Sequence, residues 1–229
     1  MLVVADYSQI ELRVAALVSN DQNMLVAYEH EIDLHRKTAA AIARLPIEQI
    51  SDEQRRLAKA VNFGLLFGQG ARGLAAYARA NYGVEMSEIE AEEARSAFFS
   101  AYPDLRNWQQ QTAKRAEFDM KVITPGGRVR DFSNETNGYR YTEALNTPIQ
   151  GGAAKILLAT LAALEISINK TGIDVKLVNV IHDEIVLEAA EEVSGQAKEY
   201  LQQAMIEGML KIFPTATTNG LVEANVGNN

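Results

Sequence analysis

Short apolar runs and helical repeats alternate at the two ends of the chain. Residues 2–5 are apolar and the run stops at Asp6, a pattern that predicts a buried strand. Residues 9–19 repeat apolar side chains at helical spacing and predict a helix after that strand. Residues 175–181 and 185–187 are rich in β-branched side chains, so we expect them to pair as a hairpin across the polar turn between them.

Capping residues mark where further helices begin and end. Two stretches open with a serine followed three residues later by Gln or Glu, the capping-box pattern, and predict helices over residues 51–67 and 87–102. We expect another helix from Pro103 to about residue 121, because proline is tolerated in a first helical turn. A long apolar helix is expected over residues 148–170, closed by Gly172.

This order of elements predicts an α+β fold. Its parts are a small antiparallel sheet with carboxylates at strand ends, helices packed on that sheet, and a large helical insertion. Residues 124–128, which include a proline and two glycines, predict a turn between two short extended pieces.

The composition of the chain limits the possible classes of protein but does not change the predicted fold. The chain has 229 residues, 47% of them hydrophobic, which allows one large domain or two small ones with a sizeable core. No apolar run approaches the ~20 residues that span a bilayer, so no membrane partner is expected. The start of the chain lacks the pattern of a signal peptide. The absence of cysteine excludes disulfides, thiolate metal sites and cysteine nucleophiles, and it fits a reducing compartment.

The net charge of −8 argues against a phosphate-rich partner, but the charges are unevenly distributed. Glutamates concentrate between residues 86 and 95, where they indicate a solvated helix face. Cations crowd one earlier segment: Arg36, Lys37, Arg44, Arg55, Arg56, Lys59, Arg72 and Arg79. A nucleotide or nucleic-acid partner therefore stays open.

Two acidic residues at expected strand ends are candidate metal ligands. Asp6 follows the first strand, and Asp183 lies in the turn of the expected hairpin. Strand ends are rigid, so two carboxylates there could hold Mg²⁺, which prefers oxygen ligands and keeps water and phosphate in its shell. Taken singly, a helix cap at Asp6 and a turn residue at Asp183 are the simpler interpretations.

A second candidate is a stripe on the helix expected over residues 51–67. Four side chains recur there at every fourth position: Arg55, Lys59, Phe63 and Phe67. Each step rotates by only ~40° around the helix, so the four form one inclined stripe. Two cations followed by two aromatic rings suit a triphosphate and a base. From spacing alone, an ordinary amphipathic helix with its aromatic rings in the core is the simpler alternative.

Two other short motifs are weaker evidence for a functional site. Residues 147–152 (Thr-Pro-Ile-Gln-Gly-Gly) allow a close approach of a ligand or another helix, but Gln150 could equally cap a helix. The Gly-Gly-Arg run that ends at Arg128 lacks the Lys-Ser/Thr ending of a phosphate-binding P-loop.

Together these segments resemble the polymerase motifs of the family A (DNA polymerase I-like) enzymes. Residues 6–13 (Asp-Tyr-Ser-Gln-Ile-Glu-Leu-Arg) look like motif A at every position. Residues 55–64 are similar to motif B, and residues 182–184 (His-Asp-Glu) are similar to motif C. Residues 33–35 and 146–151 resemble two further family segments. The resemblance runs in the family's order over nearly the whole chain.

The resemblance implies an arrangement of domains. Palm is expected at residues 1–20, with motif A, and again at residues 143–229, with the motif C hairpin at about residues 175–189. Fingers are expected at residues 21–142, with the motif B helix at about residues 52–67. Family members carry a thumb, more palm strands and usually an exonuclease domain before motif A. We therefore expect the chain to be either a fragment of a longer protein or a truncated reading frame.

The resemblance also implies roles for single residues. The expected catalytic residues are Asp6, Asp183 and Lys59. Two Mg²⁺ ions, with Mn²⁺ as an alternative, are expected on Asp6, the Tyr7 carbonyl, Asp183 and Glu184. The expected nucleotide contacts are Gln9, Glu11, His35, Arg55, Lys59 and Phe63, and the expected DNA contacts are Phe67, Arg128, Asn146, Gln150 and His182. Glu11 would close the space near the sugar's 2′ position.

The implied activity is template-directed addition of deoxynucleotides to a primer 3′-hydroxyl by two-metal phosphoryl transfer, in DNA replication or repair. The expected partners are primer-template DNA and deoxynucleoside triphosphates. A monomer in the cytoplasm of a bacterial or phage-like system is expected. Two alternatives stay open: a single-subunit RNA polymerase, and an impaired polymerase fragment that binds nucleic acid or nucleotide without catalysis.

Four positions depart from the family pattern. Phe67 stands where tyrosine is usual, and Val180 stands where glutamine is usual. Thr142 and Val129 each replace an expected arginine. Because each change removes a polar contact to DNA, we expect the isolated chain to bind primer-template weakly and to keep more of its nucleotide binding.

Overall fold

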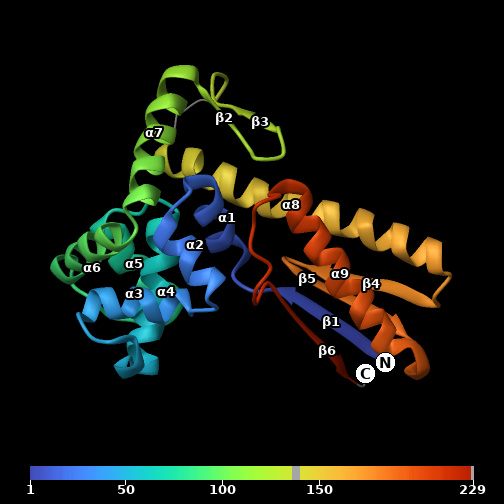
Figure 1. Ribbon diagram of the computed structural model, residues 1–229. Helices are drawn as coiled ribbons and strands as arrows, with labels where there is room; N and C mark the ends of the chain where they lie inside the picture. Colours follow the sequence, from blue (N-terminus) through green and yellow to red (C-terminus); the bar gives the residue numbers. More distant parts are fainter. Residues whose placement is uncertain (136–139, 228–229) are drawn as a thin grey trace. The chain divides into compact units, whose positions relative to one another are not determined.

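The computed structural model describes residues 1–135 and 140–227 (Figure 1). Most of the strands and helices that the hydrophobic pattern predicts are present in it. The chain folds into two units. Unit 1 comprises Met1–Val14 and Gln150–Asn229, and unit 2 comprises Ala15–Ile149. Helices predominate and the main sheet is small and antiparallel, which confirms a mixed helix and sheet fold. The palm and fingers assignment stays a prediction.

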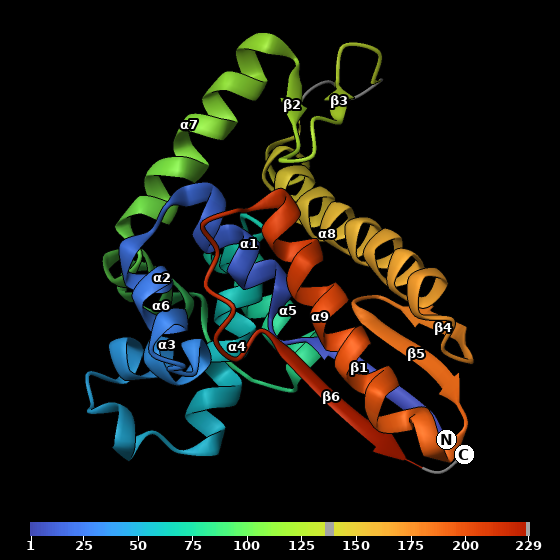
Figure 2. The ribbon, with the colours of Figure 1, turned by 45° about the vertical axis from the view of Figure 1, so that its right-hand side comes forward.

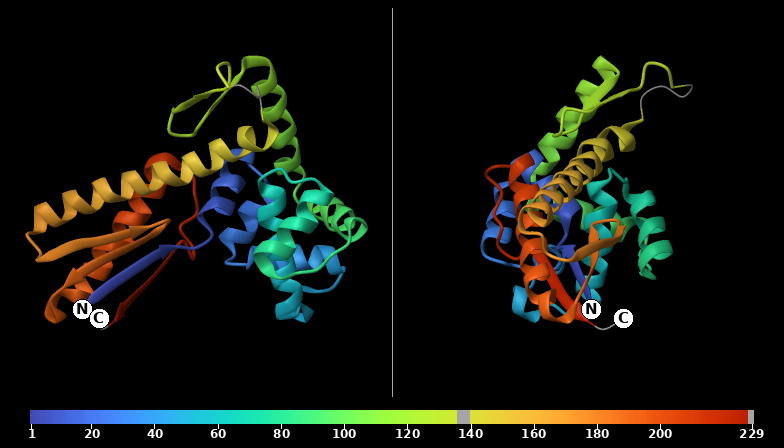
Figure 3. Two further views of the ribbon diagram at one scale, coloured as in Figure 1. Left: turned by 180° about the vertical axis from the view of Figure 1, so that it is seen from behind. Right: turned by 90° about the vertical axis from the view of Figure 1, so that its right-hand side faces the viewer.

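The described part of unit 1 is built on a four-stranded antiparallel sheet of order β4-β5-β1-β6. The strands are β1 (Leu2–Tyr7), β4 (Val175–Ile181), β5 (Glu184–Ala189) and β6 (Val222–Gly227). The start of β1 and the end of β6 lie together (Figure 3), as the pairing of Leu2 with Gly227 requires. In the middle of the sheet, Asp6 on β1 is directly opposite Glu184 on β5 and Glu223 on β6.

Helices cover one face of this sheet. The helices with residues in unit 1 are α1 (Ile10–Ser19), α8 (Tyr141–Thr171), η2 (Glu191–Val193) and α9 (Ser194–Ile212). Alternate residues of β1 are buried on that face, where α9 runs along the strands (Figure 2): Val3, Ala5 and Tyr7. The Tyr7 hydroxyl donates to the Met205 carbonyl of α9 at 2.6 Å and lies 2.6 Å from Thr160 Oγ1 of α8. Because side chains alternate along a strand, Asp6 points to the opposite face.

Over residues 15–135 and 140–149, the regular structure of unit 2 is helical apart from a short hairpin. Its own helices are α2 (Gln22–Glu29), α3 (Leu34–Ala43), η1 (Ile47–Gln49), α4 (Asp52–Leu66), α5 (Ala71–Tyr82), α6 (Glu88–Ala101) and α7 (Pro103–Asp119). The hairpin pairs β2 (Lys121–Ile123) with β3 (Val129–Asp131). Both predicted capping boxes are formed, at Ser51 and Ser87, and Pro103 lies in the first turn of α7.

Helix α8 begins earlier than the sequence predicts. The prediction placed its start at Pro148, but the helix begins at Tyr141 and Pro148 lies inside it. The proline lacks an N–H, so it cannot donate to the Ala144 carbonyl one turn before it. The turn stays helical because it buries Ala144 and Leu145 completely. Burial of apolar side chains therefore overrides the local cost of the proline.

The length of α8 also corrects the expectation about apolar segments. With 31 residues and an apolar composition, α8 meets the length and composition criterion for a helix that crosses a membrane. Only 22% of its apolar window is buried inside the structure, although Ile156, Thr160 and Leu164 are buried within unit 1.

Candidate functional site

Unit 1 gathers acidic side chains on the face of its sheet that the helices leave open. Asp6 is exposed at the end of β1, opposite Glu184 and Glu223, and Asp183 lies in the turn between β4 and β5. The pKa of Asp6 is raised to about 6 by partial loss of water first and by the charges of Asp183, Glu184 and Glu223 second, while a hydrogen bond from the Tyr7 backbone opposes the rise. The structure thus brings the two predicted strand-end acids within electrostatic reach of each other.

Glu223 is a member of this group that the sequence analysis missed. It reaches Asp6 only through the register between β1 and β6, strands at opposite ends of the chain. Like charges directly opposite each other in a sheet destabilise it. Because a carboxylate faces Asp6 from each neighbouring strand, this row of three acids across the sheet lowers the stability of the fold.

Glu11 extends the acidic group into the first turn of α1. Its carboxylate is half-buried and accepts a hydrogen bond from the Gln150 side chain. Burial raises the pKa of Glu11, the Gln150 contact opposes that rise, and the charges of Asp183 and His182 act in opposite directions. Glu11, Gln150, Asp183 and His182 therefore lie in one neighbourhood of unit 1, although they come from three separate segments of the chain.

Arg13 fixes the backbone beside this site. Its side chain is buried; Nε donates to the Ser8 carbonyl at 2.9 Å, and Nη2 donates to the carbonyls of Asn219 at 2.9 Å and Gly220 at 2.7 Å. The guanidinium joins the turn after β1 to the loop before β6. That turn includes Gln9, whose φ of 57° lies in the left-handed region, so it depends on such support.

Unit 2 holds the predicted cations near the start of α3. Asp33 caps α3, and its Oδ1 accepts from the backbone N–H groups of His35 at 2.8 Å and Arg36 at 3.4 Å. The other oxygen, Oδ2, accepts from Arg55 Nε on α4 at 2.5 Å. One carboxylate therefore caps a helix and orients the first cation of the stripe.

His35 is buried between these two helices. Its side chain is 2% exposed, its Nδ1 lies 2.8 Å from Asn62 Nδ2, and its ring centroid lies 6.0 Å from that of Phe63. The pKa of His35 is lowered to about 4, mainly by burial and also by the positive charges of Arg55 and Lys59, while the charge of Asp33 opposes the change. The imidazole is therefore neutral at pH 7.

The stripe on α4 lies at the surface of unit 2. Lys59 is exposed, and Phe63 and Phe67 are only partly buried, with ring centroids 6.4 Å apart. The simpler alternative from spacing, which placed both rings in the core, is therefore wrong. His35, Arg55, Lys59 and Phe63 form one group, which we call the cation–aromatic group.

The remaining predicted residues lie elsewhere. Arg128 is exposed next to β3, in the hairpin turn, and Phe67 ends α4 as its C-cap. Asn146 lies on the unit 2 part of α8, and its buried Oδ1 has no hydrogen-bond partner among the residues that the structure describes. The Tyr7 side chain faces α9, so only its backbone can face the acidic group.

The acidic group fits divalent cations by its chemistry. Carboxylate oxygens are hard donors that suit Mg²⁺, and a cation would relieve the repulsion that raises the pKa of Asp6. Within residues 1–135 and 140–227, however, no three His, Asp or Glu side chains converge closely enough to share one ion. Suitable oxygen ligands are therefore present, but in this structure they do not converge on one metal position.

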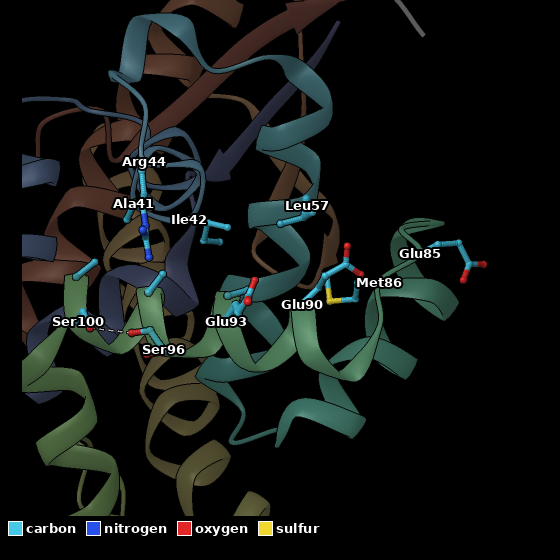
Figure 4. A pocket seen from close by; sticks show the side chains of 13 residues that line it. Ala41, Ile42, Arg44, Leu57, Glu85, Met86, Glu90, Glu93, Ser96 and Ser100 are labelled. Carbon is cyan, nitrogen blue, oxygen red and sulfur yellow. Dashed lines mark hydrogen bonds between the residues drawn. The ribbon is translucent and has the colours of Figure 1, made fainter.

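An open cavity of about 930 Å³ lies in unit 2 between α3, α4 and α6 (Figure 4). Arg44, Leu57, Glu93 and Ser96 are among the residues that line it. Its described lining includes none of the site residues predicted from the sequence. The cavity is therefore separate from the cation–aromatic group, although Leu57 lies on the same helix.

Comparison with known proteins agrees with the motifs. The family model described as DNA polymerase family A matches residues 1–229. DNA polymerase I of Aquifex aeolicus is 40% identical over 203 residues, which cover 89% of this chain and 35% of that protein. DNA polymerase I of Pseudomonas aeruginosa is 36% identical over 234 residues, which cover 100% of this chain and 24% of that protein.

A solved structure is similar over nearly the whole chain. It is the POL domain of Pol1 from M. smegmatis in complex with DNA primer-template and dNTP, with a TM-score of 0.83 and 27% identity. The match covers 97% of this chain and 38% of that one. The chain spans 35% and 24% of the two bacterial polymerases above, so it corresponds to a part of such proteins. Motifs, fold and the full-length match agree: the chain belongs to DNA polymerase family A.

Proposed function

We propose that the chain carries the active-site residues of a template-directed DNA polymerase, which adds deoxynucleotides to a primer 3′-hydroxyl. The observation that carries the proposal is the acidic group around Asp6, whose pKa is raised to about 6 by partial loss of water and by the charges of Asp183, Glu184 and Glu223. Like charges this close together repel and destabilise the fold, and acids with strongly perturbed pKa values concentrate at functional sites. Family membership gives that site its reaction.

In this proposal unit 1 is the palm and binds the metal ions. Asp6, Asp183 and the Tyr7 carbonyl would hold two Mg²⁺ ions, and Glu184 would contribute negative charge beside them. When bound, divalent ions lower the pKa of the primer 3′-hydroxyl and offset charge on the triphosphate. The rigid strand end fixes the Asp6 carboxylate, and the buried Tyr7 side chain anchors that end to α8 and α9.

Unit 2 is the fingers in this proposal, and its cation–aromatic group binds the nucleotide. Arg55 uses Nε for Asp33, and a guanidinium has further N–H donors for phosphate oxygens. Lys59 is exposed one turn further along α4 and adds positive charge for phosphoryl transfer. Phe63 packs beside the sugar and base, next to His35.

Glu11 selects deoxynucleotides in this proposal. Its carboxylate is half-buried and accepts a hydrogen bond from Gln150, which favours one position of the side chain. A fixed side chain near the sugar excludes a 2′-hydroxyl by steric clash. Gln150 and His182 lie beside it and contact the primer-template, and Phe67, Arg128 and Asn146 supply the other DNA contacts.

The relatives also support the setting of this activity. The M. smegmatis relative is described with primer-template and dNTP, and the curated relatives named above are bacterial. We infer that this chain acts on the same two partners, as a monomer in a bacterial cytoplasm, in replication or repair. An impaired fragment that only binds nucleotide or nucleic acid is the competing function, because the chain corresponds to a part of its relatives.

A chimera tests the proposal with the missing parts supplied. This chain would replace the matching segment of the P. aeruginosa DNA polymerase I, and primer extension would be measured in Mg²⁺. We expect extension by the chimera, loss of extension in Asp183→Asn, and unchanged extension in the control Asp174→Asn, an exposed loop acid of the same unit. Extension by Asp183→Asn at the unmodified rate would remove the metal assignment, and a folded but inactive chimera that binds nucleotide would favour the impaired fragment.

A further inference from the structure

A buried hydrogen bond joins the cation–aromatic group to a residue that neither motif nor spacing singled out. Asn62 lies on α4 next to Phe63, and His35 lies on the neighbouring helix α3 (Figure 1). Both side chains are buried, with 0% exposure for Asn62 and 2% for His35. Asn62 Nδ2 lies 2.8 Å from His35 Nδ1.

The orientation of the Asn62 amide, with its nitrogen toward the ring, indicates which ring nitrogen of His35 carries the proton. The amide nitrogen of asparagine is a donor only, so Nδ1 of His35 must accept from it. Burial together with the charges of Arg55 and Lys59 keeps the ring neutral, and a neutral imidazole has one N–H. The remaining proton is therefore on Nε2, which makes that nitrogen a donor.

Asn62 makes this contact at a cost. Its Oδ1 is buried and has no hydrogen-bond partner among the described residues. A buried acceptor without a partner destabilises a fold, and an apolar residue of similar size would avoid that cost. An asparagine kept here despite the cost points to a use for its donor.

We propose that Asn62 is a positioning residue: it holds His35 as the Nε2–H tautomer, so that a neutral, directed N–H donor is available to an oxygen of the incoming triphosphate. This inference rests on the proposed nucleotide-binding role of His35. A neutral donor adds a directed hydrogen bond without adding a third positive charge beside Arg55 and Lys59. The ring therefore contributes orientation, while the two cations contribute charge.

The tautomer can be observed directly. In the 229-residue chain with ¹⁵N-labelled histidine, two-bond ¹H–¹⁵N correlation spectra at pH 7 report the protonation of each ring nitrogen. We expect His35 to show an unprotonated Nδ1 and a protonated Nε2. In Asn62→Leu, which removes the donor and puts an apolar side chain of similar size in its place, we expect the two tautomers to mix. A protonated Nδ1 in the unmodified chain would overturn the inference, since Asn62 would then be the acceptor.

Nucleotide binding gives the second measurement. Titration with Mg²⁺–dATP in the absence of DNA should show binding weakened about 3- to 10-fold in Asn62→Leu, the range expected for one hydrogen bond. The neighbouring buried residue supplies the control: Val61→Ala shortens a buried side chain on the same helix and removes no hydrogen-bonding group, so it should leave the ring signals and the affinity unchanged. An equal loss in Val61→Ala would overturn the inference, because packing alone would then explain the effect.

A variant that introduces a negative charge gives a pH profile that a packing role would not produce. The groups acting on His35 are Asp33 at the start of α3 and Arg55 and Lys59 on α4. In Asn62→Asp the new carboxylate raises the pKa of His35. Nε2 of the ring then carries a donor proton only below that raised pKa, where the ring is an imidazolium. Nucleotide affinity should then fall as pH rises through it, whereas the unmodified chain keeps its donor across the same range. A flat profile in a folded Asn62→Asp variant would overturn the inference.

Two failures can be told apart. If His35→Ala binds Mg²⁺–dATP as tightly as the unmodified chain, the proposed role of His35 in nucleotide binding is wrong, and the inference falls with it. If His35→Ala weakens binding but Asn62→Leu changes neither the tautomer nor the affinity, only the positioning role of Asn62 is wrong.

Discussion

Replacing Asp6 by asparagine should stabilise the metal-free chain at neutral pH while destroying its proposed activity. The pKa of Asp6 is about 6 in the folded chain, against 3.8 for an ordinary aspartate. The folded state therefore binds the proton more tightly than the unfolded state, and the ionised carboxylate opposes folding. This penalty is complete above about pH 6, shrinks as the pH falls toward 3.8, and is absent below that value.

The magnitude follows from that difference. At ~1.36 kcal/mol per pKa unit, a change from 3.8 to about 6 corresponds to ~3 kcal/mol. The Asp6 side chain is exposed, so water and salt screen its interactions with Asp183, Glu184 and Glu223. We therefore expect a gain of about 1 kcal/mol in the free energy of unfolding for Asp6→Asn, or ~2–4 °C in Tm for a chain of this size.

Thermal and urea unfolding would be followed with EDTA present at pH 7.5 and at pH 4. The gain should be present at pH 7.5, nearly absent at pH 4, and smaller in high salt. Mg²⁺ should stabilise the unmodified chain more than the variant, because a ligand stabilises the state that binds it. The control Asp174→Asn removes one negative charge from the same unit at a position that does not act on Asp6. If Asp6→Asn is no more stable than this control at pH 7.5, the reasoning about carboxylate repulsion is refuted.

Three further predictions concern substrate selection and packing. Glu11→Ala should raise ribonucleotide use relative to deoxynucleotide use by at least ~10-fold in a primer-extension assay, and an unchanged ratio would show that Glu11 is not the steric gate. Phe63→Tyr should improve dideoxynucleotide incorporation by ~10-fold or more, since a new hydroxyl can replace the missing sugar contact; unchanged selectivity would place this ring away from the sugar. Gly208→Ala should destabilise the fold by ~1–3 kcal/mol in urea unfolding, because its Cβ would overlap Thr160 Oγ1 and lie 2.8 Å from Thr160 N. The control Gly195→Ala, on the same helix with no described atom within 4 Å of the new Cβ, should be neutral or stabilising, and an equal loss there would contradict the packing argument.

Local signals in the sequence predicted local structure well. The capping boxes at Ser51 and Ser87 set the starts of α4 and α6, because each involves residues only three positions apart. The sequence analysis gave no prediction for α2, α3 or α5, although Asp21 and Asp33 cap the first two of these helices. Their apolar faces are rich in alanine or short, so hydrophobic periodicity alone indicates them weakly.

Longer-range burial changed one boundary and one interpretation. The start of α8 lies before Pro148 because the preceding turn is buried, which no local rule for proline could predict. The rings of Phe63 and Phe67 remain at the surface although their spacing favoured the core. Spacing shows which side chains share a face of a helix, but only the packing of other helices decides whether that face is covered.

The sequence by itself determined the family, the order of the motifs and the identity of the candidate acids and cations, because those depend on residue type and spacing along one chain. The tertiary structure alone decided that Glu223 faces Asp6 and that Asn62 holds His35. Both contacts join separate elements, through the register of two strands in one case and the packing of two helices in the other. A periodic pattern indicates that a face is buried, but not which partner covers it, because many pairings bury the same apolar area. Hydrogen-bond geometry and charge at close range select one of them, and those are properties of the folded chain.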